Sequence, residues 1–454
     1  MRKLFFRRAL LPQGWAEAVA VTVDDTGRIT EVESNAQPSP EAETVAGIAL
    51  PGLANLHSHA HQRAIAGLGE RSGSGGDSFW SWREAMYRAV ARLDPEDFEA
   101  VATQLYVEML KAGYTAVAEF HYLHHAPDGR PYADPAEMAH RVAAAAQAAG
   151  MPLTLLPVHY AASGFGGLPP TEGQRRFIHD LDGFLRLTES LRAAYAGRDD
   201  VVVGIAPHSL RAVPGQELQA LAAATPDGPI HIHIAEQTRE VDDCLSHTGR
   251  RPVGWLLENL PVDGRWCLIH ATHVTAEEVA GMARAGCVVG LCPTTEANLG
   301  DGLFPAEDYF AAGGAFGIGS DSHISVSPVE ELRWLEYGAR LTHRRRTVLA
   351  GGPDRSTGRT LFETAAAGGA RACGFATGAL AVGRRADVVV LDDAHPLLAG
   401  RSGDAVLDSW IFAGNAALVR HVYIAGRAVV RDGRHPLEDQ AARRFTPVLE
   451  RLFA

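Results

Sequence analysis

Lysine is nearly absent from this chain of 454 residues. Lys3 and Lys111 are the only two, so every other permanently charged basic side chain is an arginine. The formal net charge is −12, and the acidic residues are spread along the chain without a basic face or arm between them. Nucleic acids and anionic membranes are bound through clustered positive charge, so neither is expected as a partner.

Cysteine is scarce as well. The chain has five cysteines, and no two of them show the two-residue separation of zinc and redox motifs. An odd number at irregular spacing fits free thiols in a reducing compartment better than a disulfide framework, so a cytoplasmic location is predicted. The five are Cys244, Cys267, Cys287, Cys292 and Cys373.

Long apolar runs are missing too. Near the N-terminus, Arg7 and Arg8 interrupt the run that begins at Leu4, so the pattern of a secretory signal is not met. No other stretch is long and apolar enough to span a bilayer. Apolar residues still make up 46% of the chain, enough for the large core of a barrel that carries an appended module.

The central region repeats one pattern: a short apolar run rich in β-forming residues, a polar loop, and a helical stretch. One such helix is predicted over Pro95–Ala112, between the capping residue Asp94 and Gly113. Eight strands that alternate with helices run parallel, and a closed (β/α)8 TIM barrel of the α/β class is the natural arrangement. The predicted strands are Leu50–His57, Thr115–Tyr122, Leu153–Tyr160, Val201–His208, Pro229–Glu236, Trp266–His270, Val288–Cys292 and Ala315–Asp321.

Polar residues mark the C-terminal ends of these strands, where the active sites of such barrels are built. The residues in question are His57, Tyr122, His208, His233, His270 and Asp321.

The two ends of the chain have short strands and turn signals instead. We therefore expect a small composite β-sandwich from residues 1–50 plus 378–454, beside a hydrolase barrel of residues 51–377. The glycine-rich stretch from Gly67 to Gly76 follows the first barrel strand. It is either a surface loop or a lid over the site, and its position slightly favours the lid.

Four strand-end residues have the chemistry of a metal site. His57 and His59 are two apart and face the same side of a strand, while His233 and Asp321 end the fifth and eighth strands. Three imidazoles and a carboxylate suit one divalent ion, Zn2+ or Fe2+, with room for a water whose pKa the ion lowers. Two-metal barrels commonly bridge their ions with a modified lysine at a strand end, and neither lysine lies there. Any one of these histidines alone is more simply a structural residue, but the set in barrel order favours a site.

Two further residues complete a hydrolytic centre. Glu236, three residues after His233, is placed to shuttle protons between the water and a leaving nitrogen, and its alternative is a solvated loop carboxylate. His270 is expected to orient or polarise water or substrate, and its alternative is a buried neutral histidine. Together with Asp321 they form the predicted catalytic set. His231, His273 and His323 are assigned to structural or supporting positions.

The chain resembles the amidohydrolase superfamily. The segment Leu50–His59 resembles its strand-one signature, and His233 with Glu236, His270 and Asp321 resemble the rest. The resemblance extends to Ala386–Leu391 near the C-terminus. It implies one metal ion, usually zinc, hydrolysis of amidine, amide or ring C–N bonds, and a homodimer.

A narrower resemblance, to the formimidoylglutamate deiminases, is carried by Cys292–Gly302 and Gly319–His323. It implies hydrolysis of N-formimidoyl-L-glutamate, a small dicarboxylate amidine, to N-formyl-L-glutamate and ammonia in histidine degradation. Carboxylates favour arginine, whose planar fork gives paired, charge-assisted hydrogen bonds. By this resemblance the glutamate pocket consists of Gln62, Arg83, Tyr122, His208 and Arg211.

Two alternatives remain open. An aminohydrolase acting on a purine, pterin or triazine, such as guanine, would use aromatic stacking, which Trp80 and Trp82 would provide. A barrel that has lost catalysis and serves in binding or assembly would typically lack ligands, whereas this chain has all of them.

Overall fold

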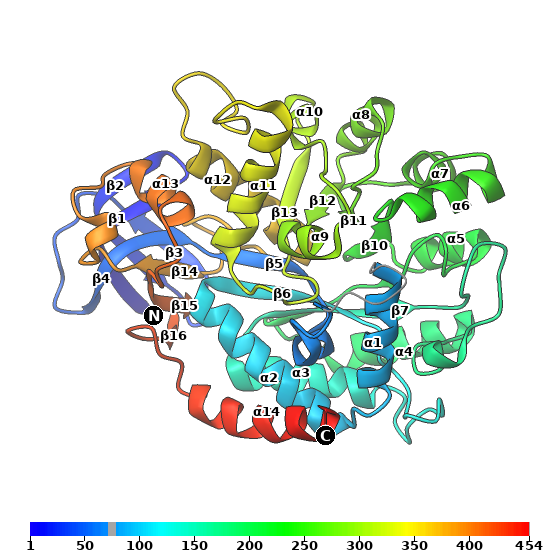
Figure 1. Ribbon diagram of the computed structural model, residues 1–454. Coiled ribbons are helices and arrows are strands. Elements are labelled where there is room, and N and C mark those ends of the chain that lie inside the picture. Colours follow the sequence, from blue (N-terminus) through cyan, green and yellow to red (C-terminus); the bar gives the residue numbers. More distant parts are fainter. Residues whose placement is uncertain (71–78, 454) are drawn as a thin grey trace.

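A closed barrel of parallel strands forms the centre of the molecule (Figure 1). The computed structural model describes residues 1–70 and 79–453, so most of the glycine-rich stretch, residues 71–76, lies outside the described residues. Strand β13 pairs with β5, and bridges from Ile205 to Ile230 and from Ser209 to His233 close the ring between the fourth and fifth positions. The predicted (β/α)8 barrel is confirmed. Its strands are β5 (Leu53–Ser58), β6 (Tyr114–His121), β7 (Leu153–His159), β8 (Val201–Val203), β9 (Ala206–Pro207), β10 (Ile230–Ile234), β11 (Trp266–His270), β12 (Val288–Leu291) and β13 (Ala315–Ile318).

The fourth barrel position differs from the single strand that the sequence predicts. It is divided into β8 and β9 around Gly204, where the chain passes very close to its neighbour. A Cβ at Gly204 would lie 2.5 Å from the carbonyl oxygen of Pro229. Both parts still pair with β7, β8 through Leu153–Leu155 and β9 through Val158 and His159.

Helices surround the barrel, and α2 (Pro95–Ala112) has the predicted bounds. The side chain of Asp94 accepts a hydrogen bond of 2.7 Å from the backbone N–H of Asp97, and Gly113 ends the helix at a φ of 107°. The other barrel helices are α1 (Phe79–Val90), α3 (Glu137–Ala149), α4 (Leu181–Ala194), α5 (Gly215–Ala223), α6 (Thr238–Thr248), α7 (Pro252–Asn259), α8 (Ala276–Ala285), α9 (Pro293–Leu299), α10 (Ala306–Ala311), α11 (Pro328–His343) and α12 (Thr357–Cys373), with 3-10 turns η1 (Ala60–Ile65) and η2 (Glu172–Gln174).

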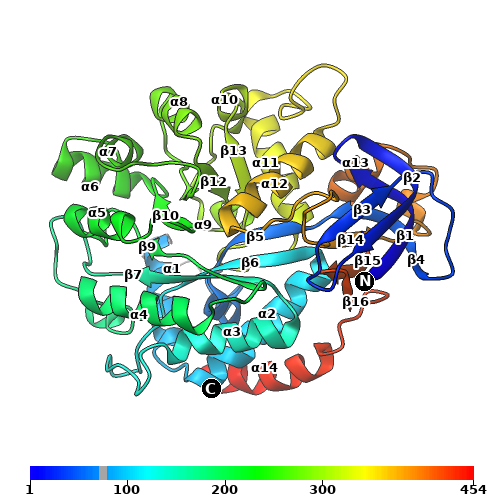
Figure 2. The same ribbon diagram turned by 180° about the vertical axis from the view of Figure 1, so that it is seen from behind.

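The two ends of the chain, for which the sequence predicts a shared β-sandwich, form one seven-stranded mixed sheet beside the barrel (Figures 1 and 2). The order is β16-β15-β14-β4-β1-β2-β3, so the N-terminal β4 pairs directly with the C-terminal β14. Apolar side chains from both halves, including Phe6, Val21 and Val390, form a separate core. The strands are β1 (Arg2–Leu11), β2 (Gly14–Val23), β3 (Ile29–Glu33), β4 (Ala42–Pro51), β14 (Val388–Leu391), β15 (Val419–Ile424) and β16 (Arg427–Val430).

The C-terminal region also contains helices that the strand pattern does not predict. These are the 3-10 turn η3 (Pro396–Leu398), α13 (Ala405–Phe412) and α14 (Glu438–Phe453). Helix α14 has Pro447 in its interior, which weakens the helical signal in the sequence. It runs along α2 of the barrel (Figure 1) and buries Ala441, Val448 and Leu452.

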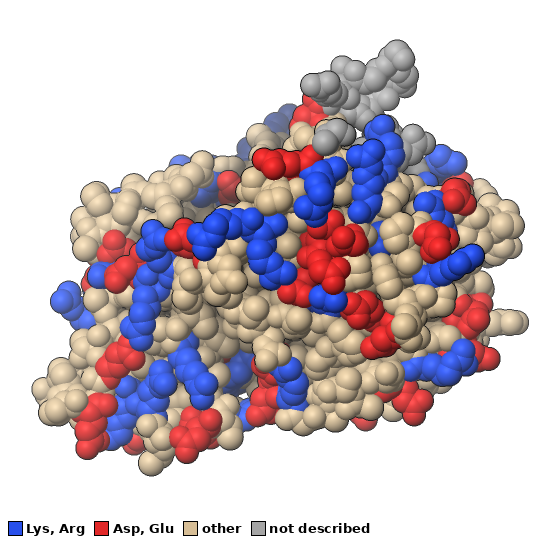
Figure 3. All heavy atoms as spheres, turned by 90° about the horizontal axis from the view of Figure 1, so that it is seen from below, with Lys and Arg blue, Asp and Glu red and all other residues tan. Residues whose placement is uncertain are grey.

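The surface carries charges of both signs (Figure 3). Acidic and basic side chains are interspersed on the face that Figure 3 shows. Over residues 1–70 and 79–453, none of the helices has the length and apolar character needed to cross a bilayer. All five cysteines are described, buried and free.

Candidate active site

Four ligand candidates from three barrel strands converge at the C-terminal end of the barrel. His57 lies within β5 and His59 just after it, His233 lies in β10, and Asp321 follows β13. The Nε2 atoms of His57 and His59 are 3.5 and 3.3 Å from Asp321 Oδ1, and His233 Nε2 is 3.0 Å from His57 Nε2. All four residues are buried.

The backbone holds Asp321 in this position. Its φ is +45°, a left-handed conformation that is uncommon for residues other than glycine. Two backbone hydrogen bonds tie it to the end of β5 and the residue that follows: Asp321 N donates to His57 O at 3.0 Å, and His59 N donates to Asp321 O at 3.2 Å. These hydrogen bonds hold the eighth strand position against the first, at the point where Asp321 meets His57 and His59.

The tautomers of two histidines indicate that a cation belongs between these groups. His59 Nδ1 is 3.0 Å from Phe120 O and His233 Nδ1 is 3.1 Å from His208 O, and a carbonyl oxygen can only accept. Both Nδ1 atoms therefore carry the hydrogen, and both Nε2 atoms turn a lone pair towards the cluster. The lone pair of His59 thus faces a carboxylate oxygen, an arrangement that a divalent cation between them makes favourable. The residues fit a metal ion.

The charge states of the cluster are those that metal binding requires. Burial is the largest influence on His57 and lowers its pKa to about 3, and burial also lowers the pKa of His59 and His233. Burial opposes ionisation of Asp321, but the contact with His57 and the nearby His59 and His270 hold the pKa of Asp321 below its usual value. Neutral imidazoles and an ionised carboxylate are the ligand forms.

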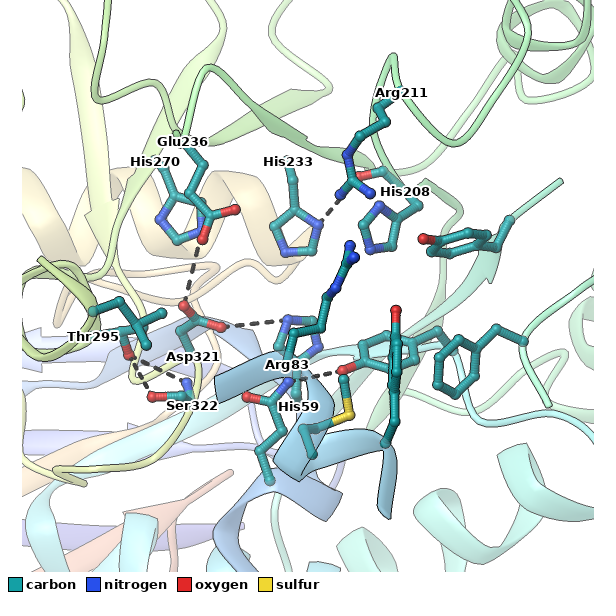
Figure 4. A pocket seen from close by; sticks show the side chains of 17 residues that line it. His59, Arg83, His208, Arg211, His233, Glu236, His270, Thr295, Asp321 and Ser322 are labelled. Atoms are coloured by element: carbon teal, nitrogen blue, oxygen red, sulfur yellow. Dashed lines mark hydrogen bonds and ion pairs between the residues drawn. The ribbon is translucent and has the colours of Figure 1, made fainter. Parts of the chain in front are cut away.

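Glu236 and His270 form a second pair beside the cluster (Figure 4). His270 Nε2 is 3.8 Å from Glu236 Oε1 and 3.8 Å from Asp321 Oδ2. Burial raises the pKa of Glu236 to about 7, against the influence of His270. Burial alone would lower the pKa of His270, but Glu236, Glu296 and Asp321 together raise it to about 10.

All the predicted substrate residues line the same pocket as these groups, and so does every other predicted site residue except His57, which lies deeper. Gln62 Nε2 donates to the hydroxyl oxygen of Tyr122 at 2.7 Å. Figure 4 shows Arg83 and Arg211 on the side of the pocket away from Glu236 and His270. The remaining lining residues are Met86, Tyr87, Tyr160, Phe177, Thr295, Leu299 and Ser322.

Three buried carboxylates contact residues of the site and are not among the residues that the sequence predicts. Glu296 Oε1 lies 3.2 Å from His270 Nδ1 and orients that ring. Glu240 accepts from the backbone N–H of Ala235 and Glu236, both at 3.1 Å. Glu119 accepts from the hydroxyl of Ser58 at 2.5 Å and from Ala60 N at 2.6 Å, which holds the turn between the first two histidines. Of these three carboxylates, only Glu296 could have been identified from the sequence, because it lies in the Cys292–Gly302 segment that resembles the formimidoylglutamate deiminases.

The three histidines that the sequence assigns to structural or supporting positions, His231, His273 and His323, are not among the residues that line the pocket. His231 Nε2 is 2.9 Å from Ala372 O, deep in the barrel. His323 Nε2 accepts from the backbone N–H of His59 at 3.2 Å, behind the cluster. The side chains of Trp80 and Trp82 lie outside the described residues.

Comparison with known protein families agrees with the barrel and its strand-end cluster. The sequence model of the amidohydrolase family matches residues 48–429. The chain belongs to this family. A second model, described as the N-terminal domain of formimidoylglutamate deiminase HutF, matches residues 1–45.

Individual relatives extend over most or all of the chain. A formimidoylglutamate deiminase of Pseudomonas aeruginosa is 57% identical over 455 residues and covers 100% of both chains. An 8-oxoguanine deaminase of the same species is 30% identical over 400 residues, 84% of each chain. The crystal structure of an amidohydrolase from Brucella melitensis superposes with a TM-score of 0.95 at 52% identity over 100% of both chains.

Proposed function

We propose that this chain hydrolyses N-formimidoyl-L-glutamate to N-formyl-L-glutamate and ammonia. The observation that carries the proposal is the presence of Arg83 and Arg211 in one pocket with the buried histidine–aspartate cluster. The full-length likeness to the formimidoylglutamate deiminase of Pseudomonas aeruginosa supports it.

The pocket matches this substrate in charge. The glutamate part carries two carboxylates, and two guanidinium groups can each give a carboxylate paired hydrogen bonds. Tyr122, Gln62 and His208 line the same pocket and supply further polar atoms. The formimidoyl end is cationic, and Glu236 and Asp321 provide negative charge on the opposite side.

We propose that His57, His59, His233 and Asp321 hold one divalent ion, zinc or iron. When bound there, the ion lowers the pKa of a water towards neutrality and so supplies a nucleophile. Barrels with two ions commonly bridge them with a modified lysine at a strand end. Here Lys111 pairs with Glu438 at 2.6 Å on the outside of the barrel and Lys3 lies in β1, so a single ion is favoured.

Glu236 carries out the proton transfers, and His270 and Asp321 position the water. Glu236 accepts a proton from the attacking water at a carboxylate oxygen and returns it to the departing nitrogen. A pKa of about 7 lets it do both near neutral pH. His270, oriented by Glu296 and protonated, and Asp321 hold the water in line with the formimidoyl carbon. A C–O bond forms at that carbon, its bond to the terminal nitrogen breaks, and ammonia leaves. As the formyl carbonyl group forms, the remaining hydroxyl proton passes to the carboxylate of Glu236, which has just given up the first.

A comparison of substrates tests the proposal. Purified enzyme loaded with zinc or iron is incubated with N-formimidoyl-L-glutamate, guanine or 8-oxoguanine, and ammonia is measured. Release from the first compound alone is expected, and release from a purine alone would overturn the substrate assignment.

The likeness to an 8-oxoguanine deaminase keeps one other substrate class in the comparison. A ring aminohydrolase would use the same histidine–aspartate cluster and Glu236, so the arginines distinguish the two. A non-catalytic barrel is disfavoured by the complete ligand set, and full metal content without hydrolysis of any candidate would restore it.

We also propose a cytoplasmic location and a homodimer. The five buried free thiols support the first, because disulfides are rare in a reducing compartment. Light scattering on the purified protein tests the second, which rests on the family alone.

A further inference from the structure

Arg176 is a buried arginine outside the active site. Only 2% of its surface is exposed, and it lies between η2 and α4. Its guanidinium group donates to three backbone carbonyl oxygens, those of Val90, of Leu93 at 2.8 Å and of His125 at 2.7 Å. A buried cation is costly unless such acceptors surround it, so this arrangement fixes the backbone that provides them.

Two of these acceptors belong to the C-terminal end of α1. Val90 is the last residue of that helix and Leu93 follows in the next turn, where carbonyl groups lack partners within the helix. An arginine there satisfies the carbonyls and faces the negative end of the helix dipole. The third acceptor, His125 O, lies in the loop after β6. The backbone N–H groups of His124 and His125 in the same loop donate to Arg176 O at 3.0 Å each.

The anchored helix carries a proposed substrate group. Arg83 and Tyr87 are four residues apart, on one face of α1, and the guanidinium carbon of Arg83 is 5.6 Å from the centre of the Tyr87 ring. Both side chains line the pocket. The end that Arg176 holds is therefore less than one turn beyond Tyr87.

The segment that contains Arg176 also contacts this face of α1. A Cβ at Gly173 would lie 2.6 Å from a ring carbon of Tyr87, so the backbone passes directly against that ring. Phe177, next to Arg176, lies 5.8 Å from the same Tyr87 ring and 4.9 Å from the ring of Tyr122, measured between ring centres. The segment therefore contacts α1 through Gly173 and Phe177.

We propose that Arg176 is a positioning residue for substrate binding: by fixing the C-terminal end of α1, it sets where Arg83 meets a carboxylate of the substrate. The inference rests on the proposed function for the role of Arg83. It assigns Arg176 no contact with substrate and no part in proton transfer.

Kinetics of Arg176→Lys test the proposal. Lysine keeps the charge but cannot donate to three carbonyl groups in a plane. We expect KM for N-formimidoyl-L-glutamate to rise about tenfold, the scale of one charged hydrogen bond, with kcat and metal content nearly unchanged. In an Arg83→Met background the same change should raise KM no further, because both act on one contact. An unchanged KM in the single variant, or full additivity in the double variant, would overturn the proposal.

A readout without substrate separates this inference from the proposed function. Hydrogen exchange at the backbone amides of residues 87–93 should become faster in Arg176→Lys while β6 stays protected. Unchanged exchange there would contradict the anchoring role whatever the substrate. If the wild-type enzyme leaves N-formimidoyl-L-glutamate intact, the proposed function fails and the exchange measurement still decides the anchor.

Arg175→Lys is the matched control. Arg175 Nε donates to Pro127 O at 2.6 Å, again a backbone carbonyl, but its contacts are with the loop and with Glu172. KM and exchange in α1 should both stay at wild-type values. If Arg176→Lys fails to fold, Gly173→Ala replaces it in the same comparison of single and double variants with Arg83→Met. The methyl group that this substitution adds displaces Tyr87. An unchanged KM there would equally count against the proposal.

Discussion

At the residue scale, Glu236 and Asp321 are carboxylates of the same pocket but differ in what surrounds them: Asp321 is buried, whereas 12% of the Glu236 side chain is exposed. Asp321 Oδ1 is within 3.5 Å of two imidazoles, whereas the imidazole partner of Glu236 is His270, at 3.8 Å. Glu236→Gln should therefore keep the metal ion and lose about 10²–10⁴ in kcat, the usual loss for a general acid–base group. Metal analysis and steady-state kinetics on one preparation measure both. Wild-type turnover in this variant would remove Glu236 from the proton transfers.

Arg211 offers a test of the substrate pocket at the same scale. Arg211→Met keeps an unbranched, apolar stem and loses the guanidinium group with its charge, so we expect KM to rise by about tenfold or more as a charge-assisted pair is lost. Arg250→Met is the control, since Arg250 is exposed, pairs with Glu258 at 2.9 Å and does not line the pocket. An equal effect of the two substitutions would contradict a specific role for Arg211.

The sequence predicts the ligands because strand geometry fixes them. His57 and His59 share a strand end, and the C-terminal ends of parallel barrel strands meet at one face. The supporting carboxylates depend on tertiary contacts between segments far apart, as with Glu119 and Ser58. Arg176 has no local signature, because its partners are carbonyl oxygens that every residue possesses.

At the scale of elements, α12 packs closely against β13 of the barrel wall. A Cβ at Gly368 would lie 1.8 Å from the carbonyl oxygen of Phe316, so the helix can pack here only without a side chain. Gly368→Ala should destabilise the fold by about 1–3 kcal/mol or more, as overpacking does.

Thermal or denaturant unfolding measures this change, and Gly254→Ala is its control. Gly254 is also helical, but the nearest atom to its added Cβ is 3.7 Å away, so alanine should be neutral or stabilise by about 0.5–1 kcal/mol. Similar changes in the free energy of unfolding for both variants would show that helix propensity, and not the contact with β13, determines the effect of alanine at Gly368.

The elements that the sequence predicts are those with a regular pattern of apolar residues or clear capping residues. All the barrel strands coincide with short apolar runs, and α2 is bounded by its capping residues. Helices α13 and α14 were missed because one is short and the other is interrupted by Pro447. Packing of α14 against α2 outweighs the local cost of that proline.

At the scale of the whole molecule, the proposed metal site joins the first, fifth and eighth strand positions of the barrel. An ion that binds only the folded chain adds about 2.7 kcal/mol to stability at 100 times its Kd. Chelation should therefore lower Tm, and zinc or iron should restore both Tm and activity. An unchanged Tm after verified removal of the metal would contradict this coupling.

The pairing of β4 with β14 has a consequence for how the protein is made. Translation delivers β4 by residue 51, whereas its neighbour β14 begins at Val388. At about 5–20 residues per second, the open edge of β4 waits for a time on the order of tens of seconds on the ribosome. Unpaired edges of this kind template aggregation, so the nascent N-terminal strands need protection until the last strands are made.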